Sequence, residues 1–71
     1  MNNLYRVEVK DYGDLDYSQM YFVKAETPDD AIRIVGISKN TEKVAVLEYE
    51  DYETIIEGII PFTLVLEWEQ P

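Results

Sequence analysis

The sequence encodes one helix in the stretch TPDDAIRIVG, residues 27–36. Thr27 can accept hydrogen bonds from the free amide groups of the first turn, and Pro28 suits the first helical position because its missing N–H would have no partner there. The two aspartates that follow lie where the helix dipole is positive, and Gly36 provides the left-handed conformation that ends many helices. We therefore predict a helix over residues 28–37.

This helix has a broad apolar face. Ala31, Ile34 and Val35 follow the i, i+3, i+4 spacing of one helical face, and Ile32 and Ile37 flank them. A face of this width must be buried, and the other segments have the patterns of strands or turns. We therefore expect the helix to pack on a sheet.

Four segments alternate between apolar and polar residues, which is typical of half-buried strands. They span residues 4–10, 19–25, 43–50 and 62–69. Residues 51–58 fit either a short helical turn or a strand, and Pro61 interrupts the pattern before the last segment. The order predicts an α+β fold, in which one helix covers one face of a small, mostly antiparallel sheet of β-β-α-β-β order. With 71 residues, the chain forms a single domain, residues 1–71.

The alternation also assigns side chains to the two faces of the sheet. The face under the helix is expected to take Tyr5, Val7, Val9, Tyr21, Val23, Ala25, Phe62, Leu64, Leu66 and Trp68. The opposite face is expected to take Glu8, Glu48, Glu50, Glu67 and Glu69, together with Met20 and Phe22. The sequence thus predicts an apolar face under the helix and an acidic face toward solvent.

Acidic residues strongly outnumber basic ones. Fifteen Asp and Glu residues face six Lys and Arg residues, for a formal net charge of −9. All six bases lie within residues 1–43, whereas residues 44–71 contain seven acids and no base. Such a surface repels nucleic acid and anionic membranes and attracts a basic protein. We expect no direct contact with nucleic acid or with membrane.

The composition argues against an enzyme and against a cofactor. The chain has no histidine and no cysteine, so it lacks the commonest general base, the commonest metal ligand and any thiolate. It has no glycine-rich phosphate loop, and a domain of this size with one helix hardly encloses a pocket. It also has no signal-peptide pattern and no apolar run long enough to span a bilayer, which fits a cytoplasmic protein.

One connecting segment clusters three carboxylates, Asp11, Asp14 and Asp16. It does not follow the EF-hand pattern, because Gln19 and Ala25 stand where a loop starting at Asp14 needs Gly and Glu. We predict no metal site. A cation-binding regulator stays as a third class of function, with a calcium- or magnesium-dependent melting shift as its signature.

Two stretches carry a resemblance to a known family: YRVEV at residues 5–9 and FVKAETPDDAI at residues 22–32. Their layout resembles the DpnD/PcfM-like small domains, which phages and other mobile elements carry. The resemblance covers residues 5–47 and implies a similar fold there and a phage-type genetic setting, but no site residues. In size and acidity the chain is also similar to phage inhibitors of host defence, such as anti-CRISPR and anti-restriction DNA mimics.

The predicted binding site lies in the acidic last third of the chain. Side chains two residues apart on a strand lie about 6.6 Å apart on one face, so Glu48 with Glu50 and Glu67 with Glu69 form two short acidic rows. Because like charges this close destabilise the free protein, we expect a cationic partner to relieve them. The predicted partner-binding residues are Glu48, Glu50, Asp51, Tyr52, Glu53, Glu57, Glu67 and Glu69.

These features predict a phage-type inhibitor that binds the basic nucleic-acid-binding surface of a host defence protein by DNA mimicry. The target would be a CRISPR effector or a restriction enzyme, and Tyr52 would act as an aromatic anchor. The alternative is a small structural or accessory interaction module without an inhibitory role, such as a homodimer that pairs through an exposed edge or through Met20 and Phe22. A solvated, solubilising surface would explain the acidic residues without any partner.

Overall fold

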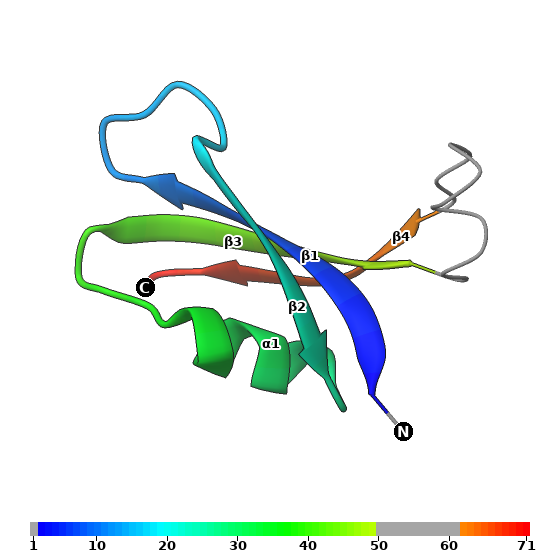
Figure 1. The fold of residues 1–71 in the computed structure, drawn as a ribbon. Helices are drawn as coiled ribbons and strands as arrows, with labels where there is room; N and C mark the ends of the chain where they lie inside the picture. Colours follow the sequence, from blue (N-terminus) through cyan, green and yellow to red (C-terminus); the bar gives the residue numbers. More distant parts are fainter. Residues whose placement is uncertain (1, 50–61) are drawn as a thin grey trace.

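The computed structural model describes residues 2–49 and 62–71, which form a sheet with one helix on one side (Figure 1). The elements in chain order are β1 (Asn3–Asp11), β2 (Gln19–Ala25), α1 (Pro28–Val35), β3 (Thr41–Tyr49) and β4 (Phe62–Glu69). The predicted α+β class and the β-β-α-β-β order are confirmed. The alternatives left open for residues 51–58 lie outside the described residues.

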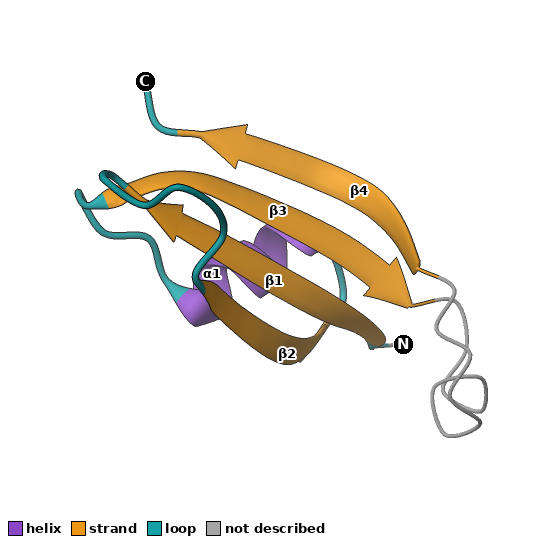
Figure 2. Cartoon of the chain, turned by 90° about the horizontal axis from the view of Figure 1, so that it is seen from above, coloured by secondary structure: helices purple, strands orange, loops and turns teal. Residues whose placement is uncertain are grey.

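The four described strands form one sheet in the order β2-β1-β3-β4, and every neighbouring pair is antiparallel. The two central strands are β1 and β3, while β2 and β4 are the edges. The helix connects β2 to β3 and lies across one face of the sheet, as the view from above shows (Figure 2). The opposite face has no helix on it within the described part of the chain.

The helix begins and ends through the capping contacts that the sequence predicts. Thr27 Oγ1 accepts a hydrogen bond from the Asp30 backbone N–H at 3.1 Å. At the other end, Gly36 has a φ of 88° and donates its backbone N–H to the Ile32 carbonyl at 2.9 Å. No helix in the described residues has the length and apolar character that crossing a membrane requires.

The buried stripe of α1 differs from the predicted one. Ala31 and Ile32 are buried and Val35 is half-buried, whereas Ile34 is 63% exposed. A stripe through positions 31, 32 and 35 leaves Ile34 roughly 100° around the helix from its centre. The prediction that Ile34 faces the sheet is therefore wrong, and Ile32 takes its place in the core.

The core lies between α1 and the two central strands. Val7 of β1 pairs with Val46 of β3, and neither side chain is exposed. The buried cluster consists of Tyr5, Val7, Val9, Val23, Ala25, Ala31, Ile32, Val44 and Val46, with Val35, Val65, Leu66 and Trp68 packed against it. The predictions for Tyr5, Val7, Val9, Val23 and Ala25 are confirmed. Tyr21 stays 42% exposed, because it lies on an edge strand.

A β-bulge in β4 divides that strand between the two faces of the sheet. Leu66 pairs with Val46, but Leu64 pairs with Leu47, so Val65 has no partner in the register. Leu66 and Trp68 consequently face the helix, as predicted. Phe62 and Leu64 lie on the opposite face with exposed side chains, which corrects their predicted burial in the core.

The face of Glu48 is also corrected. Glu48 pairs with the buried Tyr5, so its side chain projects on the helix side of the sheet. The physical reason is that residues 44–47 of β3 are apolar at every position, and the alternation therefore cannot decide which set faces the core. Val44 and Val46 take the core positions, and Glu48 follows them two residues later.

The valine at the centre of the core allows a test of the packing. Val46→Ala should lower the free energy of unfolding by about 2 kcal/mol, because it removes two buried methyl groups and leaves a cavity. Leu15→Ala is the control: Leu15 is fully exposed, and its truncation should change stability by less than about 0.5 kcal/mol. Urea unfolding followed by circular dichroism measures both changes. Equal effects would contradict this packing.

Candidate functional site

The sheet face opposite α1 is the best candidate surface for a function, and we call it the open face. Its residues follow from the strand register: Leu4, Arg6, Glu8 and Lys10 of β1, Met20, Phe22 and Lys24 of β2, Lys43, Ala45, Leu47 and Tyr49 of β3, and Phe62, Leu64, Glu67 and Glu69 of β4. Along the strands, this face divides into two halves. The apolar half contains Phe22, Leu47, Tyr49, Phe62 and Leu64, and the charged half contains Glu8, Lys10, Lys43, Glu67 and Glu69, with Arg6 at the boundary.

The apolar half is built around three aromatic rings from three strands. Phe22 stacks on Tyr49 with ring centroids 6.0 Å apart, and Tyr49 meets Phe62 edge-on at 6.1 Å. The Arg6 guanidinium lies 5.7 Å from the centroid of the Phe62 ring, in a cation–π contact. Phe22 and Phe62 remain substantially exposed despite these contacts, and so does Leu64 beside them. The apolar half therefore offers contact area to a partner.

Three bases of the open face form ion pairs. Arg6 pairs with Glu8, Lys10 pairs with Glu42, and Lys43 Nζ lies 3.4 Å from Glu69 Oε1. The hydrogen bond from Arg6 to Glu8 raises the pKa of the Arg6 guanidinium, and the bond from Lys43 to Glu69 likewise raises the pKa of Lys43. These contacts neutralise part of the acidity that the sequence predicts for this face.

Tyr17 lies beside Glu67 in the charged half. It comes from the connection between β1 and β2, and it lines a hollow of about 290 Å³ together with Lys43, Glu67, Trp68 and Glu69. Partial burial raises the pKa of the Tyr17 hydroxyl, and the negative charge of Glu67 raises it further. A tyrosine beside carboxylates suits the rim of a protein interface.

The connection between β1 and β2 is held by its own hydrogen bonds. The Asp14 carboxylate accepts bonds from the Ser18 hydroxyl at 2.7 Å and from the Asp11 backbone N–H at 3.2 Å, and both lower the pKa of Asp14. Among residues 2–49 and 62–71, no group of acidic side chains is arranged to hold a metal ion. Asp14 thus orders its own loop.

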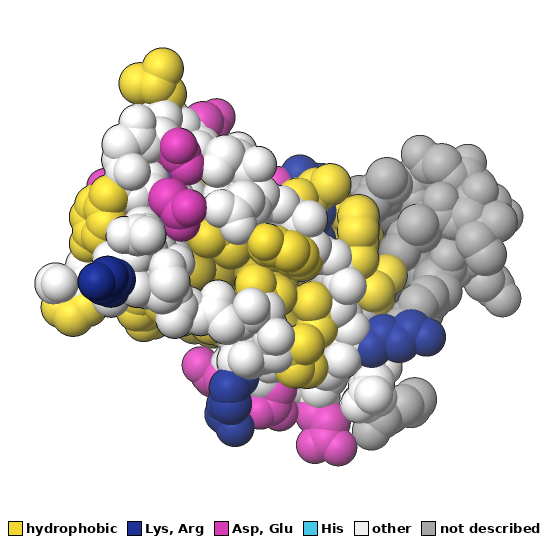
Figure 3. Space-filling view, turned by 60° about the vertical axis from the view of Figure 1, so that its left-hand side comes forward, with side chains coloured by type: hydrophobic (Ala, Val, Ile, Leu, Met, Phe, Trp, Pro, Cys, Tyr) yellow, Lys and Arg dark blue, Asp and Glu magenta, His cyan; other side chains and the backbone are white. Residues whose placement is uncertain are grey.

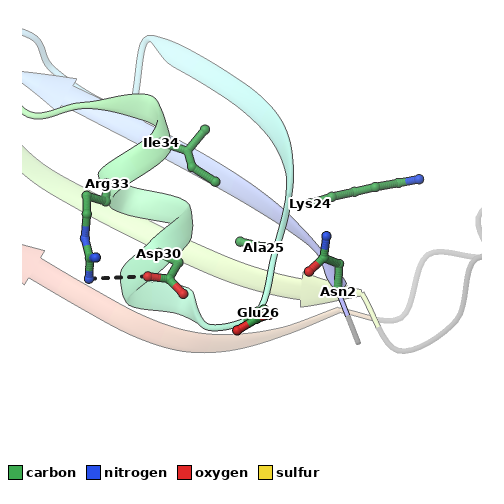
Figure 4. A pocket seen from close by; sticks show the side chains of 7 residues that line it. All are labelled: Asn2, Lys24, Ala25, Glu26, Asp30, Arg33 and Ile34. Carbon is green, nitrogen blue, oxygen red and sulfur yellow. Dashed lines mark ion pairs between the residues drawn. The ribbon is translucent and has the colours of Figure 1, made fainter.

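A hollow of about 410 Å³ lies between the end of β2 and α1 (Figure 4). Arg33 reaches toward Asp30, with which it forms an ion pair at 3.3 Å, and Lys24 extends away from the helix. The charged groups here do not converge on a common point. The hollow therefore lacks the arrangement of an active site.

The structure places the predicted site residues in three groups. Glu67 and Glu69 lie together on the open face, as expected. Glu48 lies on the helix side and is separated from them by the sheet. The others, Glu50, Asp51, Tyr52, Glu53 and Glu57, lie outside the described residues. Tyr17 and Glu8 join Glu67 on the open face. Tyr17 was absent from the predicted set, because only the folded loop brings it there.

The ion pairs leave the charge imbalance in place. Each of the four ion pairs between described residues combines one base with one acid, so the formal net charge of −9 is unchanged by them. Comparison of the chain with protein-family models, curated proteins and solved structures finds no match. The resemblance to DpnD/PcfM-like domains therefore stays a prediction.

The pair formed by Tyr17 and Glu67 allows a test of the charged half. Glu67→Gln should lower the pKa of the Tyr17 hydroxyl, because a neutral amide no longer opposes the phenolate charge. The nuclear magnetic resonance signals of the Tyr17 ring during an alkaline titration measure this shift. Glu26→Gln, at the far end of β2, is the control and should leave Tyr17 unchanged. If the pKa of Tyr17 did not change in Glu67→Gln, the Tyr17 hydroxyl and the Glu67 carboxylate would not lie close together.

Proposed function

We propose that this chain is a small binding protein, without catalytic activity, that captures a basic protein surface. In this proposal the partner is a nucleic-acid-binding enzyme, and the chain acts as a phage-type inhibitor that occupies the groove meant for phosphates. The observation that carries the proposal is the net charge of −9 on 71 residues. A surface of this kind accelerates association with a cationic partner and opposes contact with nucleic acid itself.

We place the contact on the charged half of the open face and the adjoining loop. Glu67 and Glu69 project there, Tyr17 lines the same hollow as Glu67 and Lys43, and the exposed Asp16 precedes Tyr17 in the chain. Arg and Lys side chains of a partner could replace the ion pairs that Lys43 and Arg6 now make. The predicted contacts in residues 50–57 remain part of the proposal on sequence grounds alone.

A second candidate function rests on the apolar half of the open face. Phe22, Phe62 and Leu64 are exposed on one continuous surface, and a surface of this composition favours a protein contact that depends little on charge. The chain would then be an accessory interaction module. Phe22→Asp would abolish its association, whereas charge reversals would have little effect.

Charge reversal at the contact tests the inhibitor proposal. The immobilised chain should capture a DNA-binding enzyme from a host lysate, and duplex DNA should displace it. The double variant Asp16→Lys, Glu67→Lys should weaken this binding about tenfold or more, mainly through slower association. Surface plasmon resonance with the purified partner measures the rates. Raising the salt from about 0.1 to 1 M should weaken the binding too, because the screening length falls from about 10 to 3 Å.

The matched control is the double variant Glu26→Lys, Glu48→Lys. It changes the net charge by the same amount, but neither residue belongs to the proposed contact, since Glu48 projects on the helix side. It should bind nearly as the unaltered chain does. Equal losses in both double variants would show that only net charge matters. Capture that resists both the reversal and high salt would contradict DNA mimicry and favour the accessory module.

A further inference from the structure

The two edges of the sheet differ in how they are protected against pairing with another strand. The edge strand β4 contains the bulge at Val65 and the two glutamates, Glu67 and Glu69, which are devices that disfavour edge-to-edge pairing. The edge strand β2 has no bulge and no acidic residue, and Lys24 is its one charged side chain. Its register with β1 runs without interruption from Asn3 opposite Ala25 to Val9 opposite Gln19. Alternate backbone N–H and C=O groups of an edge strand point outward, so β2 offers them to another chain.

The edge formed by β2 is also free of negative charge. Its seven residues, QMYFVKA, include one lysine and no acid, although the whole chain has a net charge of −9. Each of the other described strands carries at least two acids. The repulsion between two copies of this chain is therefore weakest where their β2 edges meet.

Apolar side chains are exposed on both faces of β2. Met20 and Phe22 are 51% and 58% exposed on the open face, and Tyr21 is exposed on the helix side, where it lines a hollow with Val35 and Ile37. The side of the molecule in Figure 3 has hydrophobic side chains at its centre and charged ones around them. Two hollows, of about 410 and 340 Å³, are lined jointly by β2 and by α1 or the residues that follow it. They leave room for side chains of an added strand.

We infer that β2 pairs with β2 of a second copy of this chain, antiparallel and about a two-fold axis at Phe22, to form a continuous eight-stranded sheet. Phe22 is the middle residue of β2, so only this register pairs all seven residues. Lys24 then lies opposite Met20 of the second copy instead of opposite a second lysine. Tyr21 of each copy lies opposite Val23 of the other.

This arrangement goes beyond the proposed function and does not depend on it. The charged half of the open face lies toward β4, so it stays accessible in both copies. The two aromatic clusters of the open faces meet at the paired Phe22 residues and become continuous. A dimer that failed to form would leave the proposed binding of a basic partner untouched.

Sedimentation equilibrium of the full chain tests the pairing. The unaltered chain should have twice its monomer mass of 8.3 kDa at high micromolar concentration. Met20→Lys should weaken the dimer about tenfold, because each added lysine faces Lys24 of the other copy, which gives two like-charge contacts per dimer. Met20→Glu should preserve or tighten it, because each added carboxylate faces that same lysine. Circular dichroism checks that each variant is folded.

The matched control is Leu64→Lys, which places the same charge on an exposed open-face position of the other edge strand. It should leave the dimer intact. In the unaltered chain, the amide hydrogens of β2 should exchange more slowly as the concentration rises. A monomer at all concentrations, or a dimer broken by Leu64→Lys and not by Met20→Lys, would overturn the inference. Equal weakening by Met20→Lys and Met20→Glu would overturn the register.

Discussion

The burial of one short helix against the two central strands holds this domain together. A helix of eight residues is not stable alone in water, so α1 depends on its contact with the sheet. The sheet in turn buries Val7 and Val46 only where α1 covers them. One helix can cover only one face, and the other face is left to make contacts outside the described core. The division of the molecule into a structural face and a binding face follows from this constraint.

The sequence predicts the helix and the strand order because the information for them is local. Thr27 and Gly36 act on the backbone of their immediate neighbours. In β1, apolar and charged side chains alternate, so the side chains of one face are apolar and those of the other are charged. The prediction fails for Ile34, because the angle at which a helix meets its sheet depends on residues distant in the chain. It fails for Glu48, because β3 is apolar on both faces around its centre.

The candidate site is predicted only in part for the same physical reason. The excess of acidic residues follows from the composition. The placement of Glu67 and Glu69 on the same face follows from their spacing of two residues. The approach of Tyr17 to Glu67 depends on how the connection between β1 and β2 folds over the sheet. The ion pairs of Lys10 and Lys43 depend on the strand register. Neither the position of Tyr17 nor these ion pairs can be predicted from the order of charges along the sequence.

The unpaired Val65 has a consequence for how this protein can vary in length. Losing one residue from a regular strand reverses the orientation of everything beyond it. Here Leu64 and Leu66 already point to opposite sides, as consecutive residues of a regular strand do. Removal of Val65 would therefore keep both parts of β4 in phase with β3. A deletion at Val65 therefore disturbs the strand pairing less than a deletion in a regular part of the sheet, and relatives of this chain should tolerate a gap here.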